Sequence, residues 1–153
     1  MNETETIEQT LPAPETAGSG NEPQNNSGSG KRNGSDLREL VNGVCIVLYG
    51  YIGTLKNEGH TSMGNLLFQE MMCMIAAASL TSESIGRDRF TENLEKGFYS
   101  SGRLLVYLEF CGTLDKNNTV REAIVESVTG IHKIFAASVK TVKSRQSKQN
   151  MCV

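Results

Sequence analysis

The amino-acid sequence predicts an all-α protein, and three observations support this class. Beyond residue 36, apolar side chains recur every three or four positions over long stretches, which is the period of an amphipathic helix. No stretch alternates apolar and polar residues convincingly enough for a half-buried strand. No turn of the Asn-Gly type joins two such stretches into a hairpin. Helices are therefore expected throughout the folding part of the chain.

The first 36 of the 153 residues are predicted to form a disordered tail. They hold all three prolines and only five apolar side chains, and their six acids outnumber Lys31 and Arg32. A segment with so little apolar surface cannot offset the entropy that ordering would cost. We therefore expect an acidic and polar tail over 1–36, one helical domain over 37–145, and a flexible C-terminal tail over 146–153.

Two amphipathic helices are predicted in the first half of the domain. Asp36 with Glu39 resembles a capping pair that opens the first helix, and Gly59 separates it from the second. In the second helix, Gln69 and Glu70 are expected to face away from the core. The two apolar stripes are Leu37, Val41, Val44, Leu48, Tyr51 and Leu55, followed by Met63, Leu67, Met71, Met74, Ile75 and Ala78.

A short helix and a central helix are expected next. Asp88 can cap the short helix, and Ser100-Ser101-Gly102 is expected to loosen the chain after it. The segment LLVYLEFC, from Leu104 to Cys111, is apolar on every side apart from Glu109. A helix that is apolar all round must be covered all round, so this segment is predicted to lie at the centre of the bundle. The short helix carries Phe90, Leu94 and Phe98.

A long amphipathic helix is predicted to close the domain. Thr119 with Glu122 forms a second capping box at its start. Its apolar stripe consists of Val120, Ile124, Val128, Ile131, Phe135, Val139 and Val142.

The sequence predicts neither catalysis, nor a cofactor, nor a metal site. His60 is expected in a loop and His132 on the last helix, and no nucleophile stands in a recognisable motif beside either of them. The four cysteines are far apart and lack the short paired spacing of metal ligands. We expect small buried hydrophobic residues and one tail thiol from Cys45, Cys73, Cys111 and Cys152.

The charge and the terminal segments predict a cytoplasmic protein. The N-terminus is acidic and polar, unlike a signal segment, and no apolar run approaches the ~18–20 residues of a membrane span. The net charge of -2 gives no large electrostatic footprint for a nucleic acid or an anionic membrane. We therefore expect neither a nucleic-acid partner nor a transmembrane anchor.

Arg103 stands at the start of the predicted central helix without a partner nearby in the sequence. Glu109 is nearly two turns away, and helix neighbours pair at three or four positions. Two interpretations follow. Arg103 is either a surface residue with its aliphatic stem packed down, or a fixed guanidinium that awaits an external carboxylate.

The segment GRLLVYLEFCG, from Gly102 to Gly112, resembles the first homology motif of the Bcl-2 family of apoptosis regulators. In that family a Gly-Arg pair opens the central hydrophobic helix, and the apolar run ends in Glu-Phe-x-Gly. Phe68, a few residues after Gly64-Asn65, is similar to the Gly-Asp-x-x-Phe region of the third homology motif. The resemblance implies a Bcl-2-like helical bundle around a central hydrophobic helix.

The resemblance also implies a function, the inhibition of apoptosis. Pro-survival members capture the death-motif helix of a pro-apoptotic protein in a hydrophobic groove. Arg103 would pair with an aspartate of that helix, and Gly102 would let its backbone approach. The groove would be lined by Phe90, Leu94, Leu105, Val106, Phe110, Phe68 and Met72. The partners would be Bim-like proteins, with Bak and Bax as further candidates.

The chain departs from the family pattern at several points. Ser100-Ser101 replaces the Asn-Trp that usually precedes Gly-Arg, and the second homology motif and the membrane anchor are not found. A short, diverged version of this fold is typical of a viral survival factor, which would act in the host cytoplasm or peripherally at mitochondria. Apolar surface left without terminal helices would favour a homodimer.

Two other functions fit the same pattern of helices. One is a small four-helix-bundle protein that binds RNA or a reverse transcriptase. The other is a pro-death member of the Bcl-2 fold. The first would use a modest basic strip near the C-terminus, which consists of Lys133, Lys140, Lys143, Arg145 and Lys148. The same cations also suit the negative end of a helix dipole.

Overall fold

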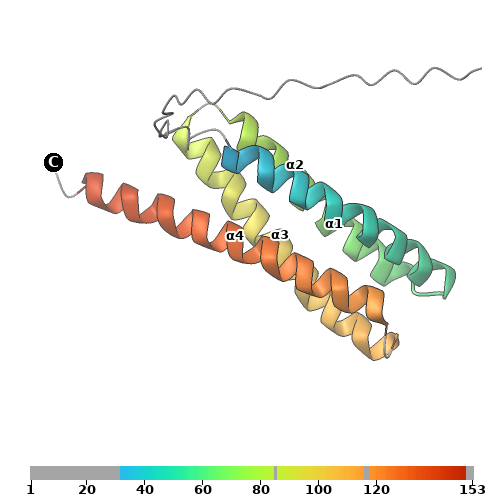
Figure 1. Cartoon of the computed structure of the whole chain (residues 1–153). Helices are drawn as coiled ribbons and strands as arrows, with labels where there is room; N and C mark the ends of the chain where they lie inside the picture. Colours follow the sequence, from blue (N-terminus) through green and yellow to red (C-terminus); the bar gives the residue numbers. More distant parts are fainter. Residues whose placement is uncertain (1–31, 85, 116–117, 151–153) are drawn as a thin grey trace, which may run out of the picture.

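The computed structural model describes residues 32–84, 86–115 and 118–150, and within these ranges the protein is entirely helical (Figure 1). Its four helices are α1 (Arg32–Asn57), α2 (Thr61–Glu83), α3 (Arg87–Leu114) and α4 (Thr119–Asn150). The predicted all-α class is confirmed. Gly59 and Gly86 stand in the two connections on either side of α2 with φ of 92° and 109°, a backbone region that glycine enters without strain.

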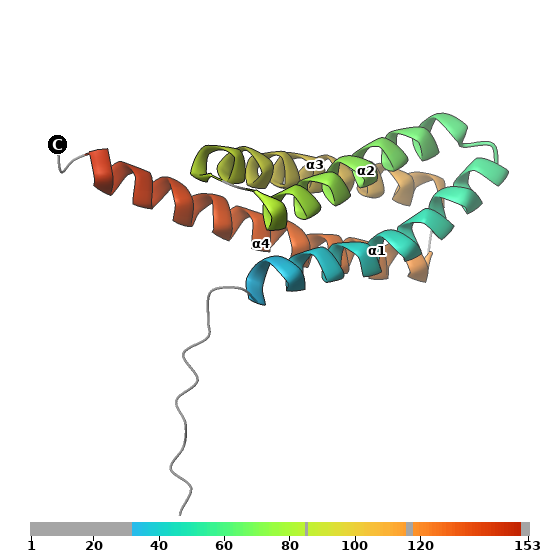
Figure 2. The same ribbon diagram turned by 90° about the horizontal axis from the view of Figure 1, so that it is seen from above.

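The helices form an up-and-down bundle in which each packs against its neighbours in the chain. α1 contacts α2, α2 contacts α3, α3 contacts α4, and α4 returns to α1, so α1 and α3 lie diagonally opposite (Figures 1 and 2). Short connections favour this arrangement because they leave consecutive helices antiparallel and adjacent. The core runs along the middle of the bundle.

The apolar stripes predicted for the first two helices face this core. All six stripe residues of α1 are buried, and four of the six in α2 are buried while Met63 and Ile75 are half-buried. In α4 the stripe is buried from Ile124 to Phe135. Val120, in the first turn of α4, is exposed. Val139 and Val142 are half-buried, because α4 leaves the bundle toward its C-terminal end.

The predicted boundaries of the domain fall inside helices. α1 begins at Arg32, so Asp36 lies within it and does not cap it. At the other end, α4 continues to Asn150. Most of the predicted N-terminal tail, residues 1–31, lies outside the described residues, as do residues 151–153 with Cys152.

The caps predicted for α3 and α4 are also displaced. The N-cap of α3 is Gly86, and Asp88 lies in the first turn. At the start of α4, the Asn118 side-chain oxygen accepts a hydrogen bond from the Arg121 backbone N–H at 3.1 Å. Asn118 therefore fills the capping position that was predicted for Thr119.

The prediction of a separate short helix before the central helix is wrong, because α3 is continuous from Arg87 to Leu114. Ser100 and Ser101 are buried in the middle of it. The Ser101 hydroxyl donates to the Phe98 carbonyl at 3.0 Å and lies 2.9 Å from His132 Nδ1 on α4. Because the Ser101 hydroxyl is satisfied by a carbonyl of its own helix and by a histidine of α4, this serine does not break α3.

The prediction that the Leu104–Cys111 segment is covered on every side is also wrong. α3 has α2 and α4 as neighbours, and α1 lies across the diagonal. Leu104, Leu108 and Cys111 are buried, but Val106 and Phe110 are 61% and 54% exposed. Two neighbouring helices cover only part of a helix circumference, so the apolar residues on the remaining sector face outward.

Candidate functional site

The Arg103 guanidinium already has an internal partner. Its Nε and Nη2 donate to Glu70 Oε1 and Oε2 on α2 at 2.7 and 2.8 Å, which makes a two-pronged ion pair. The hydrogen bond to Glu70 raises the pKa of Arg103. The Glu70 side chain is 8% exposed and that of Arg103 is 51% exposed. The prediction that Glu70 faces away from the core is wrong, because its carboxylate is buried between α2 and α3, where it accepts both hydrogen bonds from Arg103.

The residues predicted to line a groove lie on different sides of the bundle. Phe68 faces α1, with its ring centre 6.3 Å from that of Tyr49 and 5.8 Å from Lys56 Nζ. Met72 follows one helical turn later and is exposed. Arg103 lies on the opposite side of α2, where that helix meets α3. Phe68 and Met72 therefore do not share a groove with Arg103.

The remaining predicted residues divide between the core, the surface and the contact with α4. Leu94 is fully buried and Leu105 packs partly against the core. Val106 and Phe110 are exposed on α3. Gly102 faces α4, where an added Cβ would lie 3.4 Å from His132 Cε1. This glycine is half-buried beside the neighbouring helix, and its role of admitting a ligand backbone stays a prediction.

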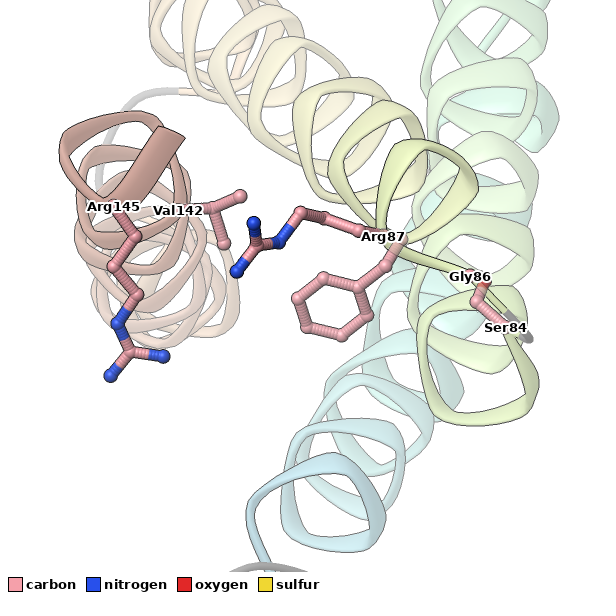
Figure 3. Close-up of a pocket in the computed structure, with 6 residues that line it drawn as sticks. Ser84, Gly86, Arg87, Val142 and Arg145 are labelled. Carbon is pink, nitrogen blue, oxygen red and sulfur yellow. The ribbon is translucent and has the colours of Figure 1, made fainter. Parts of the chain in front are cut away.

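The beginning of α3 and the end of α4 enclose a cleft that the sequence did not reveal. Its volume is about 300 Å³. Figure 3 shows Arg87 extending from the start of α3 toward Val142 on α4, and Arg145 of α4 also lines the cleft. Phe90 contributes an apolar wall. The other lining residues are Ser84 and Gly86 from the preceding connection.

A second hollow of about 460 Å³ lies beside the same part of α4. Phe98 forms its aromatic side, and that ring stacks on His132 with ring centres 4.6 Å apart. Lys143 lies at the hollow and donates to Glu95 Oε1 at 2.7 Å, which raises the pKa of Lys143. The remaining lining residues are Ala136, Val139, Lys140, Ser144 and Ser147.

The cations of α4 are concentrated in the half that borders these two hollows. After Glu126, the helix contains no acidic residue up to its end at Asn150. It carries five cations there, namely Lys133, Lys140, Lys143, Arg145 and Lys148. In both views the last turns of α4 project beyond the start of α3 (Figures 1 and 2). The C-terminal part of this strip therefore lies on a helix end that its neighbours cover little, while Lys143 pairs with Glu95 on α3.

A buried polar cluster joins α1, α3 and α4 at the other end of the bundle. The Tyr51 hydroxyl donates to Asp115 Oδ2 at 2.6 Å. Asp115 Oδ1 lies 3.2 Å from Arg121 Nε, an ion pair without the alignment of a hydrogen bond. Burial, followed by the bond to Asp115, raises the pKa of Tyr51. The sequence offered no signal for this cluster, because its members come from three helices.

The described residues contain no group of histidine, cysteine and acidic side chains that could hold a metal ion. Cys45 and Cys111 are buried as predicted, and burial raises the pKa of Cys45 to about 11, which keeps its thiol neutral. Cys73 is exposed, which contradicts the prediction. Ser101 is fully buried beside His132, where its hydroxyl serves the α3–α4 contact.

Among the described helices, α2 is long and apolar enough to cross a membrane, with a mean hydropathy of 1.2 over an 18-residue window. Because α2 meets this test by length and composition alone, the expectation of no transmembrane segment stays a prediction. In the structure, 39% of that window is buried and its apolar stripe packs against α1 and α3. The composition of α2 is thus also that of a core helix.

Comparison of the chain with known protein families, curated proteins and solved structures finds no match.

Proposed function

We propose that this protein is a small four-helix-bundle protein that binds RNA through the second half of α4. The observation that carries the proposal is the acid-free stretch of α4 after Glu126, which carries five cations and ends in turns that project from the bundle. The net charge of -2 obscures this feature because six acids in the first 36 residues offset it. Phosphate binding depends on the local surface, where Lys and Arg replace the counterions of the RNA backbone.

The positions of the cations suit contact with the extended sugar-phosphate backbone of an RNA strand. At 100° per residue, Lys133, Lys140 and Lys148 lie within about 80° of one another on the side of α4 opposite Phe135. They span about 22 Å along the helix axis, since each residue adds about 1.5 Å. A strand of RNA laid along α4 would therefore meet cations at intervals over several turns.

The hollows on either side of this strip favour single-stranded RNA. Phe90 and Phe98 are half-buried in them, and each has arginine or lysine side chains at the same hollow. Unpaired bases stack on aromatic rings while neighbouring cations contact the phosphates. Duplex RNA hides its base faces and could use the cations alone.

Charge reversal on α4 is the test of this proposal. We expect Lys140→Glu with Lys148→Glu to weaken binding of a labelled single-stranded RNA, measured by fluorescence anisotropy at several salt concentrations. The logarithm of the RNA association constant falls linearly with the logarithm of the salt concentration. Each lost phosphate contact should make this slope less steep by about 0.7, so the loss of two contacts should change it by about 1.4.

The matched control is Arg89→Glu with Lys96→Glu, which changes the net charge equally on exposed positions of α3. This control should bind RNA with the wild-type salt dependence. An equal loss in both variants, or no RNA binding by the wild type, would contradict the proposal.

A second candidate function is capture of a death-motif helix, and one observation favours it. Arg103, Val106 and Phe110 follow one another at i, i+3 and i+7 on α3, and each is more than half exposed. An amphipathic ligand helix could place its apolar face against Val106 and Phe110 and pair one aspartate with Arg103. That aspartate would have to compete with Glu70 for the guanidinium.

This candidate predicts that Glu70→Gln strengthens the binding of a death-motif peptide, because the internal competitor is removed. Arg103→Ala should weaken it at least about tenfold, or about 1.4 kcal/mol. Calorimetric titration of the wild type and both variants with a panel of such peptides measures these changes in affinity. Equal affinities for wild type, Glu70→Gln and Arg103→Ala would exclude Arg103 from peptide binding.

A further inference from the structure

The outward face of α1 has an unusual composition for a helix on the surface of a bundle. Residues 40–55 include no Asp, Glu, Lys or Arg. Nevertheless Leu40, Ile46, Val47 and Tyr49 on this stretch are 44%, 76%, 49% and 62% exposed. The outer face of a solvated helix normally carries charged residues. A charge-free face over four turns is typical of a surface that another protein covers.

Three glycines on this face have no role inside the bundle. Gly43, Gly50 and Gly53 are exposed, and a Cβ added at any of them would meet nothing within 4 Å. Glycine in the interior of a helix costs about 1 kcal/mol relative to alanine. No internal close approach offsets this cost, whereas an external helix could approach the backbone closely there.

The adjacent part of α2 extends the apolar face. Phe68 and Met72 are 38% and 47% exposed. Two hollows lie on this part of the surface, with volumes of about 250 Å³ and about 370 Å³. Tyr49 borders both of them. The other lining residues are Ile52, Gly53, Lys56 and Phe68 in the smaller hollow, and Asn42, Cys45, Ile46, Met71 and Ile75 in the larger.

We propose that this face, defined by the outward residues of α1 from Leu40 to Thr54 with Phe68 and Met72 of α2, binds a second copy of the chain in an antiparallel, two-fold arrangement. The midpoint of Gly43 and Gly50 falls between Ile46 and Val47. A two-fold axis at that point sets Gly43 of each copy opposite Gly50 of the other. The two backbones then approach where neither has a side chain, and Ile46 packs at the centre.

Charged residues lie only at the two ends of the face. Asp36, Arg38 and Glu39 precede the charge-free stretch, and Lys56 follows it. Arg38 pairs with Glu83 on α2 at 3.5 Å. In the antiparallel register, Lys56 of one copy reaches the level of these three residues of the other, so charged residues flank an uncharged centre at both ends of the contact.

The size of the face is adequate for a stable dimer. Residues 36–56 extend over about 30 Å, and two adjacent helices are about 20 Å wide. The flat area of the face is therefore about 600 Å² per copy, and protruding side chains add to this area. A standard interface buries roughly 800 Å² per partner, which is close to this value.

The first test measures the mass of the full-length chain in solution by sedimentation velocity. The wild type should be a dimer at micromolar concentration, and Gly50→Glu should be a monomer. Because an added side chain at Gly50 meets nothing, the helical content and melting temperature of this variant should be retained. The control is Gly130→Glu on α4, which is equally open and exposed and should remain a dimer.

A monomeric wild type, or a Gly50→Glu variant that remains a dimer, would overturn the proposal. So would a monomeric wild type that binds phosphatidylcholine vesicles and loses this binding with Gly50→Glu, because the occupant of the face would then be a membrane.

The second test examines the antiparallel register by disulfide trapping. Ile46→Cys places two thiols beside the two-fold axis and should form a covalent dimer on mild oxidation. Thr54→Cys lies on the same face but about 22 Å from its equivalent, at about 1.5 Å per residue, and should not form one. Equal cross-linking at both positions would show a parallel arrangement and overturn the proposal.

Discussion

Replacing Asp115 with alanine is expected to lower the free energy of unfolding by about 3–5 kcal/mol, the cost of removing one member of a buried ion pair. The Arg121 side chain is only 15% exposed and its Nε has Asp115 as its charged neighbour. Without that carboxylate the guanidinium would remain buried and unpaired, and the Tyr51 hydroxyl would lose its acceptor. Denaturation in urea, extrapolated linearly to water, measures the loss.

Tyr51→Phe provides the matched control for this prediction. It removes the hydroxyl but leaves the pair between Asp115 and Arg121 in place. Its expected cost is about 1.5–3 kcal/mol, the range for a hydrogen bond to a charged group. If Asp115→Ala were no more destabilising than Tyr51→Phe, the ion pair would contribute nothing to joining the helices.

Replacing Gly97 with alanine is expected to destabilise the bundle by up to about 2 kcal/mol, because overpacking a core usually costs about 1–3 kcal/mol and alanine in a helix returns about 1 kcal/mol. A Cβ at this position would lie 2.3 Å from two ring atoms of Phe135, which is fully buried on α4. The ring or the helix would have to shift, and this cost exceeds the gain of about 1 kcal/mol that alanine brings to a helix. Thermal and urea denaturation of the variant measure the net change in the free energy of unfolding.

Gly130→Ala is the control for this effect, because an added Cβ at Gly130 meets nothing within 4 Å. We expect this variant to be stabilised, with the opposite sign to Gly97→Ala. Adding Phe135→Leu to Gly97→Ala should recover part of the lost stability, because the smaller side chain gives the Cβ room. Stabilisation by Gly97→Ala alone would show that α3 and α4 can separate there without cost.

The candidate site was predictable from the sequence only in part. The basic strip on α4 was visible, because helical cations without intervening acids form a local pattern. The cleft beside it was not, since Arg87 and Val142 are 55 residues apart and meet only when α3 packs against α4. Arg103 pairs with Glu70, which lies 33 positions away, so no neighbouring position in the sequence indicated its partner.

The helical character of the described chain and the apolar side of each helix follow from the sequence. These properties depend on residues three or four positions apart, so the stripe from Leu37 to Leu55 could be predicted without knowing its neighbours. Which helices meet, and at what register, depends on how they pack. This packing keeps α3 continuous, leaves Val106 and Phe110 exposed, and separates Phe68 from Arg103. Helical periodicity does not encode such contacts, because they depend on the packing of segments that are distant in the chain.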